Sequence, residues 1–364
     1  MAMFTGRRTR LRPVPRAPGL ACQAMKNLPT LSALVWVLGF VPAAALLGAC
    51  DQRPMIEPPL AQPASGSVPA SQPQPAAVTS SAAGTSTART AAPAFIPPPD
   101  SAIPDNEFGQ KVKLGQRIFN NTGQEAPQFV GNTLRCANCH LDSGRLANSA
   151  PLWAAYVAYP AYRSKTGRVD TFSERLQGCF VYSMNGKAPP AGGDVLVALE
   201  SYAFFLAKGA PVGASLPGRG YPTPAQPPLA VDFARGEIVF QQKCALCHGA
   251  DGQGQSSHGA VVFPALWGPQ SFNWGAGMGS LKNAAGFIKA NMPLSQGNTL
   301  TDQEAWDVAA FMNSHERPQD PRFQGSVADT RNKYHDSPDD MYGRTVNGQV
   351  LGQGLAPATK TRGH

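Results

Sequence analysis

The sequence lacks the features with which proteins hold nucleic acids: it has no basic stripe and no recognition motif. Its formal net charge is +8, but the first 49 residues contain six basic residues and no acidic one. Six of the eight positive charges therefore belong to this N-terminal stretch, and only +2 remains beyond it. We expect no nucleic-acid partner.

Large apolar residues are scarce between Asp51 and Pro99, where Pro, Ala, Ser, Thr and Gln dominate. Such a segment cannot bury enough surface to offset the entropy lost on ordering. We therefore predict a disordered tether over residues 50–100. Two other stretches carry little apolar pattern: a Gly- and Pro-rich linker over residues 211–229, and a polar tail over residues 319–364.

The one long uncharged apolar run lies near the N-terminus, from Leu31 to Leu47. It is followed by Leu47-Gly48-Ala49-Cys50, which resembles a bacterial lipoprotein cleavage site with Cys50 as the lipidated residue. The alternative is a transmembrane anchor, but the run is slightly short and holds Gly39 and Pro42. We predict a signal peptide over residues 1–49, with the mature chain in the periplasm and attached to the membrane by lipid only.

Met25-Lys26-Asn27 is also typical of a signal-peptide start, which makes Met25 an alternative first residue. In that case Cys22 has no role. Of the seven cysteines, Cys50 is assigned to lipid and four belong to two Cys-x-x-Cys-His motifs. Cys179 is left over, and an unpaired cysteine in an oxidising compartment asks for an explanation.

Two segments of the chain repeat each other. Each begins with a helical pattern that places an aromatic residue four positions after a glycine, at Gly115 and Phe119 and again at Gly236 and Phe240. Each continues with a Cys-x-x-Cys-His motif, and each ends in an amphipathic helix. These final helices are predicted over Asp194–Ala207 and over Thr301–Ser314, where Thr301 and Glu304 form a capping box.

In cytochrome c folds the first and last helices cross at such a glycine, with aromatic residues packed over the contact. We therefore predict a mainly α fold with two cytochrome c-type haem domains in tandem, over residues 101–210 and 230–318.

The haem motifs are Cys136-Ala137-Asn138-Cys139-His140 and Cys244-Ala245-Leu246-Cys247-His248. Two thiols spaced by two residues match the two vinyl groups of one haem, and the adjacent histidine is placed to ligate the iron. A redox disulfide or half a zinc site is the alternative for a single motif. Two motifs, each inside a cytochrome-like frame, predict two covalently bound haem c groups.

The second domain offers a methionine as the distal ligand of its iron. Met292-Pro293 lies 44 residues after His248, in a loop ahead of the last helix, and a thioether ligand raises the reduction potential. Met278 and Met312 are the competitors, and Met312 falls within a helix pattern. His258 and His315 suit loop or helix-end positions, and His335 and His364 lie in the polar tail.

The first domain has a different supply of ligands. Between His140 and its last helix there is no other histidine, and Met184 is the only methionine. Cys179 lies 39 residues after His140, close to where a distal ligand belongs. A thiolate ligand stabilises Fe(III) and lowers the potential. The alternative is a buried apolar cysteine, the usual fate of free thiols.

The sequence around these ligands resembles the dihaem thiosulfate dehydrogenases. The resemblance runs in register from about Pro104 to Pro318 and rests on three stretches. They are Ser173-Glu174-Arg175-Leu176-Gln177-Gly178-Cys179-Phe180-Val181-Tyr182-Ser183-Met184-Asn185-Gly186-Lys187, Ser271-Phe272-Asn273-Trp274-Gly275-Ala276-Gly277-Met278, and Asn291-Met292-Pro293.

That family couples two thiosulfates to tetrathionate and releases two electrons, and some members run in reverse. The resemblance implies that His140 and Cys179 ligate the catalytic haem, and that His248 and Met292 ligate the haem from which electrons leave. Some members have a lysine next to the methionine, where this chain has Asn291. Arginine often precedes the serine of the Ser-Met-Asn-Gly motif, where this chain has Tyr182.

Two thiosulfate dianions about 4 Å apart repel by roughly 4 kcal/mol even in water, so a catalyst must supply positive charge. Basic residues bracket Cys179, and a solvated basic face is the alternative reading of them. We predict that Arg175, Lys187 and Arg163 bind the anions, that Ser183 adds a hydroxyl donor, and that Cys179 bonds to substrate sulfur. Lys165 and Arg168 complete the basic set.

The predicted activity is therefore the oxidation of thiosulfate to tetrathionate, with a soluble or membrane cytochrome as electron acceptor. Three alternatives stay open. The chain could be a dihaem electron carrier with no substrate of its own, or a tetrathionate reductase that uses the same residues. It could also be a related cytochrome that loads thiosulfate onto a carrier protein's cysteine.

Overall fold

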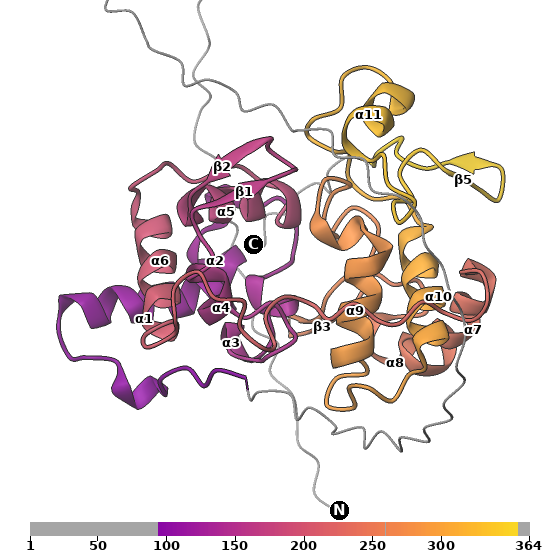
Figure 1. The fold of residues 1–364 in the computed structure, drawn as a ribbon. Helices are drawn as coiled ribbons and strands as arrows, with labels where there is room; N and C mark the ends of the chain where they lie inside the picture. The colour runs from indigo at the N-terminus through magenta and orange to yellow at the C-terminus, as the bar shows by residue number, and fades with distance from the viewer. Residues whose placement is uncertain (1–93, 259, 356–364) are drawn as a thin grey trace, which may run out of the picture. The chain divides into compact units, whose positions relative to one another are not determined.

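The computed structural model describes residues 94–258 and 260–355 (Figure 1). The predicted signal peptide, the lipidation site Cys50 and the tether up to residue 93 lie outside this range, as does His364. Within the described range, no helix is both long and apolar enough to cross a membrane.

The fold is mainly helical, as predicted, and the three sheets among the described residues are two-stranded antiparallel hairpins. The first haem domain consists of η1 (Asp100–Ala102), α1 (Glu107–Asn120), α2 (Thr122–Glu125), η2 (Pro127–Phe129), η3 (Cys136–Asn138), α3 (Leu141–Gly144), α4 (Leu152–Tyr156), β1 (Ala161–Arg163), β2 (Arg168–Asp170), α5 (Phe172–Gly178), the π-helical turn η4 (Cys179–Ser183) and α6 (Asp194–Leu206).

The second haem domain repeats the pattern of a first helix, a haem motif and a last helix, and further elements follow it. It contains α7 (Phe233–Lys243), α8 (Ala245–His248), β3 (Gln255–Ser257), β4 (Ala260–Phe263), η5 (Gly277–Gly279), α9 (Leu281–Asn291) and α10 (Asp302–Asn313). The chain then forms α11 (Val327–Tyr334), β5 (Thr345–Val346) and β6 (Gln349–Val350).

In each domain the first and last helices cross at the glycine that the sequence singled out (Figure 1). A Cβ on Gly115 of α1 would lie 2.0 Å from the carbonyl oxygen of Ala198 in α6. A Cβ on Gly236 of α7 would lie 1.9 Å from that of Asp307 in α10. Only glycine allows this approach, because its missing side chain is where the partner backbone lies. The capping box of Thr301 and Glu304 is confirmed at the start of α10.

Replacing Gly115 with alanine is expected to destabilise the protein by more than the ~1–3 kcal/mol typical of overpacking, because the clash is with backbone rather than a flexible side chain. Thermal unfolding followed by circular dichroism measures this as a lower Tm. Gly123→Ala is the matched control: a Cβ there meets nothing within 4 Å, so the Tm should hold or rise slightly. Equal Tm values for the two variants would contradict the assigned helix crossing.

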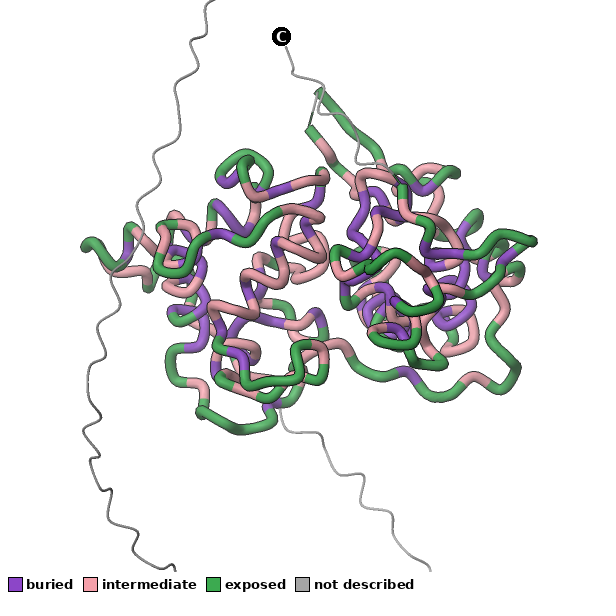
Figure 2. Tube along the Cα trace, turned by 90° about the horizontal axis from the view of Figure 1, so that it is seen from above, coloured by how far each residue is buried: buried purple, intermediate pink, exposed green. Residues whose placement is uncertain are grey.

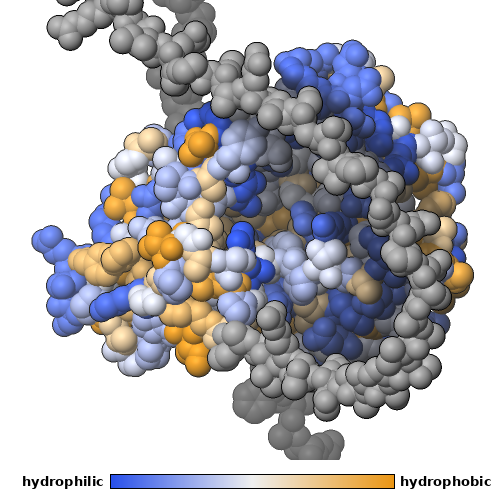
Figure 3. Space-filling model, viewed as in Figure 1, coloured by the Kyte–Doolittle hydropathy of each residue, from blue (hydrophilic) through white to orange (hydrophobic). Residues whose placement is uncertain are grey.

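Figure 2 shows buried stretches of chain in both domains, and their aromatic and aliphatic residues make up the hydrophobic core. Phe119 packs near Tyr202 in the first domain, and Phe240 packs near Phe311 in the second, each pair bridging the first and last helices. On the face seen in Figure 3, hydrophobic and hydrophilic residues are interspersed. The described part of the chain therefore buries its main apolar groups within the domains.

The chain after Pro318 has more structure than its polar composition predicts. It is built around His335, which is 3% exposed and bonds Asp320 Oδ2 at 2.9 Å and Asp340 Oδ2 at 2.7 Å. The two carboxylates raise the pKa of this imidazole against the effect of its burial. A polar core of this kind leaves no hydrophobic periodicity in the sequence. The hydrophobic pattern therefore did not indicate that the segment after Pro318 is structured.

The predicted linker also has a definite place. Gly218 and Gly220 accept backbone hydrogen bonds from Asn148 and Ala150 of the first domain, at 2.7 and 2.8 Å. Tyr221 donates to the carbonyl of Cys139 at 3.2 Å. The segment that joins the domains thus lies against the first haem motif.

Candidate active site and haem pockets

A cavity of about 350 Å³ brings together the residues predicted to hold the first haem. Cys136 enters it from η3, Cys139 and His140 directly follow η3, and Cys179 enters from η4. Burial raises the pKa of the Cys136 thiol and that of the Cys139 thiol to about 12. The five described cysteines are all free of disulfides. The cavity therefore holds two thiols for attachment, an imidazole, the further thiol of Cys179, and the thioethers of Met184 and Met278.

His140 is fixed for ligation by its surroundings. Its Nδ1 lies 2.7 Å from the carbonyl oxygen of Ala150, and burial lowers its pKa to about 4, so the ring is neutral and Nδ1–H donates. This leaves the lone pair of Nε2 available for a metal, the usual arrangement of a ligating histidine. Ala150 has a φ of 46°, a left-handed conformation that costs energy for a residue with a Cβ. The linker bond from Gly220 helps to hold it there.

Cys179 begins a π-helical turn directly after α5. Thr171 and Glu174 form a capping box at the start of α5, which fixes where that helix begins. The change from α to π geometry at Cys179 widens the turn, and such turns occur often at functional sites.

The nearest charged group to Cys179 is Arg175, one helical turn earlier. Its Nη1 donates to Cys179 Sγ at 3.0 Å. The charge of the thiolate raises the pKa of Arg175, which outweighs the opposing effect of burial. The sequence analysis named Arg175 as an anion-binding residue, and the structure places it in contact with Cys179.

The other predicted anion-binding residues separate into two groups. Arg163 and Ser183 line the first cavity, and Arg163 donates to the hydroxyl of Tyr159. Lys187 is exposed and does not line the cavity, so the geometry gives no support to its predicted role. Arg168 is paired with Glu174 at 2.7 Å on the surface, and Lys165 lies 4.0 Å from the ring centre of Tyr182.

Several residues of the cavity wall were not predicted. Arg135 directly precedes the first haem motif, a position that offered a signal. Arg219 and Tyr221 come from the linker, and Asn283 comes from α9 of the second domain. No local pattern marks these three, because they reach the cavity through tertiary contacts.

A second cavity, of about 380 Å³, collects the residues predicted to hold the second haem. Cys244, Cys247 and His248 line it together with Met292. His248 Nδ1 lies 3.0 Å from the carbonyl oxygen of Pro264, and burial lowers the pKa of the ring, so its Nε2 is also free to ligate. Met278 and Met312 line the same cavity, so the competition among the three methionines stays open.

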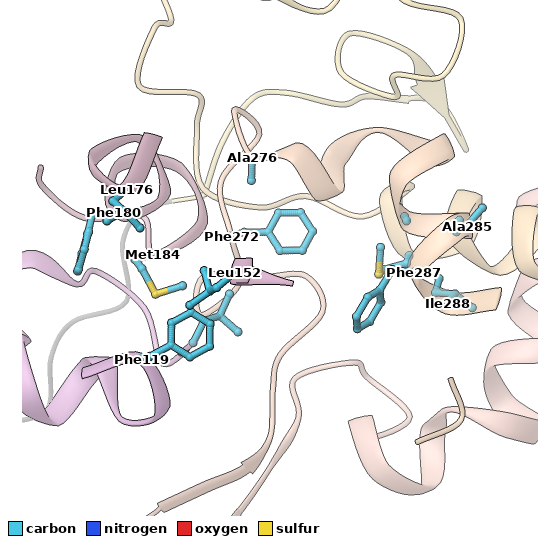
Figure 4. Packing of buried hydrophobic residues seen from close by; sticks show 14 of the residues in the cluster. Phe119, Leu152, Leu176, Phe180, Met184, Phe272, Ala276, Ala285, Phe287 and Ile288 are labelled. Atoms are coloured by element: carbon cyan, nitrogen blue, oxygen red, sulfur yellow. The ribbon is translucent and has the colours of Figure 1, made fainter. Parts of the chain in front are cut away.

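The two cavities share part of their walls. Phe272 and Met278 of the second domain line both, as do Leu134, Arg135 and Cys139 of the first domain. Figure 4 shows the ring of Phe272 between Leu152 and Met184 on one side and Phe287 on the other. The guanidinium of Arg317, which is fully buried, stacks on Phe272 at 4.2 Å. The pockets are therefore neighbours across one aromatic ring.

Both donor sets fit a c-type haem. Each cavity offers two thiols in one turn of chain for covalent attachment, and a neutral histidine whose Nδ1 is already held. Each also offers sulfur from a different part of the fold, the thiol of Cys179 and two thioethers in the first cavity and three thioethers in the second.

Comparison with known proteins agrees with this reading. Residues 127–212 match the family model described as "SoxA/TsdA, cytochrome c domain", and residues 231–312 match that of "Cytochrome C oxidase, cbb3-type, subunit III". The protein is thus a cytochrome with two c-type haems, one in each domain.

Its relatives narrow the class further. The chain is 61% identical over 263 residues to the thiosulfate dehydrogenase of Thiomonas intermedia, an alignment covering 72% of this chain and 84% of the relative. It is 52% identical over 263 residues to that of Stutzerimonas stutzeri, covering 72% and 86%. The chain belongs to the thiosulfate dehydrogenase family.

A solved structure shares the fold. It is the thiosulfate dehydrogenase TsdBA of Marichromatium purpuratum in its "as isolated" form, with 53% identity and a TM-score of 0.71. The match covers 73% of this chain and 59% of that one, so this chain spans less than two thirds of its length.

Proposed function

We propose that this protein oxidises thiosulfate in the first cavity, couples two of these anions to tetrathionate, and passes the electrons out through the second domain. The observation that carries the proposal is the contact of Arg175 with Cys179 inside a haem cavity. It places a cation and a nucleophilic sulfur at one point, which an anion with a reactive sulfur requires.

Positive charge around the cavity offsets the repulsion between two dianions. Arg135, Arg163, Arg175 and Arg219 all line it, and no Asp or Glu does among the described residues. Arginine offers paired donors in one plane, which match the oxygens of a sulfonate group. The hydroxyl of Ser183 is a further donor on the same wall.

The chemistry proceeds in two steps with Cys179 as the nucleophile. In the first, the Cys179 thiolate and the outer sulfur of one thiosulfate form a sulfur–sulfur bond, and two electrons leave. In the second, the outer sulfur of another thiosulfate attacks the substrate sulfur of that bond. Tetrathionate is released and the Cys179 thiolate is restored, so atoms and charge balance with two electrons produced per tetrathionate.

A bound c-type haem supplies one-electron redox chemistry, so the two haems together can accept the electron pair. In this proposal His140 and Cys179 would hold the iron of the first cavity, and Cys179 would leave or share that position when its sulfur bonds to substrate. His248 and Met292 would hold the iron of the second cavity. Arg175 donates a hydrogen bond to the sulfur of Cys179 and orients it. The final acceptor is an external soluble or membrane cytochrome.

The test is a steady-state assay of the purified holoprotein with thiosulfate and a one-electron acceptor, in which tetrathionate is measured directly. Half a tetrathionate per thiosulfate consumed is expected. Acceptor reduction without tetrathionate would reject the coupling reaction and favour a cytochrome that loads thiosulfate onto a carrier. No reaction with either thiosulfate or tetrathionate would favour a simple electron carrier.

Arg175→Gln is expected to lower kcat/KM for thiosulfate by about 10- to 100-fold, because a hydrogen bond to a charged group contributes about 1.5–3 kcal/mol. Arg168→Gln is the control, since that guanidinium pairs with Glu174 on the surface. Stopped-flow or steady-state kinetics measure the change in kcat/KM for thiosulfate in both variants. Similar losses in both would point to a diffuse basic face rather than a specific contact.

The same residues also support the reverse reaction, the reduction of tetrathionate. The direction depends on the potentials of the two haems and of the external partner.

We also propose that the protein acts in the periplasm, held to the membrane through lipid on Cys50. Labelling with a fatty acid, in the wild type and in Cys50→Ser, tests this: loss of the label in the variant is expected.

A further inference from the structure

The π-helical turn η4, which begins at Cys179, does not supply hydrogen-bond donors for all of its own backbone carbonyls. Within it, the carbonyl oxygens of Cys179 and Phe180 accept from Met184 N and Gly186 N, at 3.0 and 2.9 Å. The next three carbonyls, of Val181, Tyr182 and Ser183, come at the end of the helical run, where partners from the same helix are missing. All three are instead bonded from elsewhere in the fold.

Asn273 of the second domain serves two of these three carbonyls. Its Nδ2 donates to Val181 O at 2.9 Å, and its backbone N donates to Tyr182 O at 3.2 Å. The third carbonyl, of Ser183, accepts from Asn132 Nδ2, which also donates to Ser271 O. The end of the catalytic turn is therefore held largely by the segment 271–275.

The side chain of Asn273 is fully used. It is 1% exposed, and its Nδ2 also donates to Asn185 Oδ1 at 3.1 Å, while its own Oδ1 accepts from Gly275 N at 3.1 Å. Only an amide supplies two donors and an acceptor in this space. A carboxylate would keep the acceptor but would face two oxygens with no proton to offer.

The segment is itself firmly anchored. Trp274 N donates to Pro318 O at 3.0 Å, and a Cβ on Gly275 would lie 2.5 Å from the Tyr182 ring. Phe272, the residue before Asn273, forms the wall between the two cavities. The segment that holds the Cys179 turn is therefore fixed to the fold directly beside Asn273.

We propose that Asn273 is a positioning residue for the reaction: the second domain uses it to hold the Cys179 turn in register with the first haem cavity. The inference rests on the proposed function, since its effect on catalysis acts through Cys179. The alternative is a purely structural asparagine whose loss lowers stability and nothing else.

The experiment compares Asn273→Asp and Asn273→Ala with the wild-type holoprotein. Electron paramagnetic resonance of the oxidised protein reports the ligand field of each low-spin haem separately. Both variants should broaden or split the thiolate-type signal of the first haem, while the signal of the second haem stays in place. The kcat for thiosulfate should fall by about 10- to 100-fold, the scale expected when a reacting group is displaced by about 1 Å.

Asp307→Asn is the control. Asp307 is 2% exposed, and its carboxylate accepts from Asp232 N at 2.7 Å and from Arg235 Nε at 2.9 Å, both within the second domain and neither in the wall of the first cavity. It should lower the Tm by a similar amount but leave the first haem's signal unchanged. If Asn273→Asp does not fold, Asn273→Ala, which buries no carboxylate, gives the answer.

The outcomes separate the two proposals. A wild-type spectrum without a thiolate-type signal would overturn the ligation by Cys179, and the role of Asn273 with it. A wild-type spectrum with that signal, unchanged in both Asn273 variants, would leave the proposed function standing and reject only the positioning role.

Discussion

Replacing Cys179 with alanine is expected to reduce thiosulfate turnover by about 10³-fold or more, because the variant loses the nucleophile and the distal sulfur together. The side chain lines the first cavity, and its Sγ accepts a hydrogen bond from Arg175 at 3.0 Å. Without the sulfur, two dianions must meet with no covalent step to divide the barrier. Tetrathionate formation by the purified holoprotein measures the loss.

Absorption and paramagnetic resonance spectra of Cys179→Ala provide the control. The first haem should lose its thiolate-type signal, whereas the second haem should keep its spectrum and its potential, because Cys179 does not line the second cavity. If the variant turned over thiosulfate at a near-normal rate, the two-step mechanism would be refuted. The protein would then use the first cavity for outer-sphere electron transfer alone.

Replacing Met292 with histidine is expected to lower the potential of the second haem substantially, since axial ligands set haem potentials over a range of roughly 0.8 V. A thioether favours Fe(II), and an imidazole removes that preference. Every 59 mV of loss is a tenfold change in the one-electron equilibrium, so electron transfer from the first haem to the second becomes less favourable. Spectroelectrochemical titration of the α-band gives the potential directly.

Met278→Leu and Met312→Leu are the controls for this assignment, because both methionines line the same cavity as Met292. Leucine preserves the packing volume and removes the sulfur. Neither substitution should move the potential of the second haem by a comparable amount. If Met278→Leu produced the large shift and Met292→His did not, the ligand would be Met278.

The features predictable from the sequence are those set by local spacing. Gly115 and Gly236 signalled two helix crossings, because a four-residue step to an aromatic side chain places both groups on one helix face. The haem motifs put their thiols and histidine within a single turn. Arg175 and Cys179 are four residues apart on one helix, so their contact also follows from the chain itself.

What could not be predicted comes from contacts distant in the chain. Arg219 lies in a Gly- and Pro-rich stretch that looks like a spacer, yet it lines the first cavity. Asn273 is 94 residues after Cys179, and no pattern indicates that its amide meets the Val181 carbonyl. The segment around His335 is organised by buried charge rather than by hydrophobic periodicity, so a periodicity argument passes over it.

The shared wall at Phe272 and Met278 has a consequence for how such a protein can change over time. A catalytic half copied without residues 271–278 and 219–221 would carry its haem motif but lack two sides of its substrate chamber. Gene fission between the haem motifs would therefore destroy the enzyme, although each fragment could still attach a haem. Recombination among related genes should accordingly keep the two haem domains together and exchange only the segments that flank them.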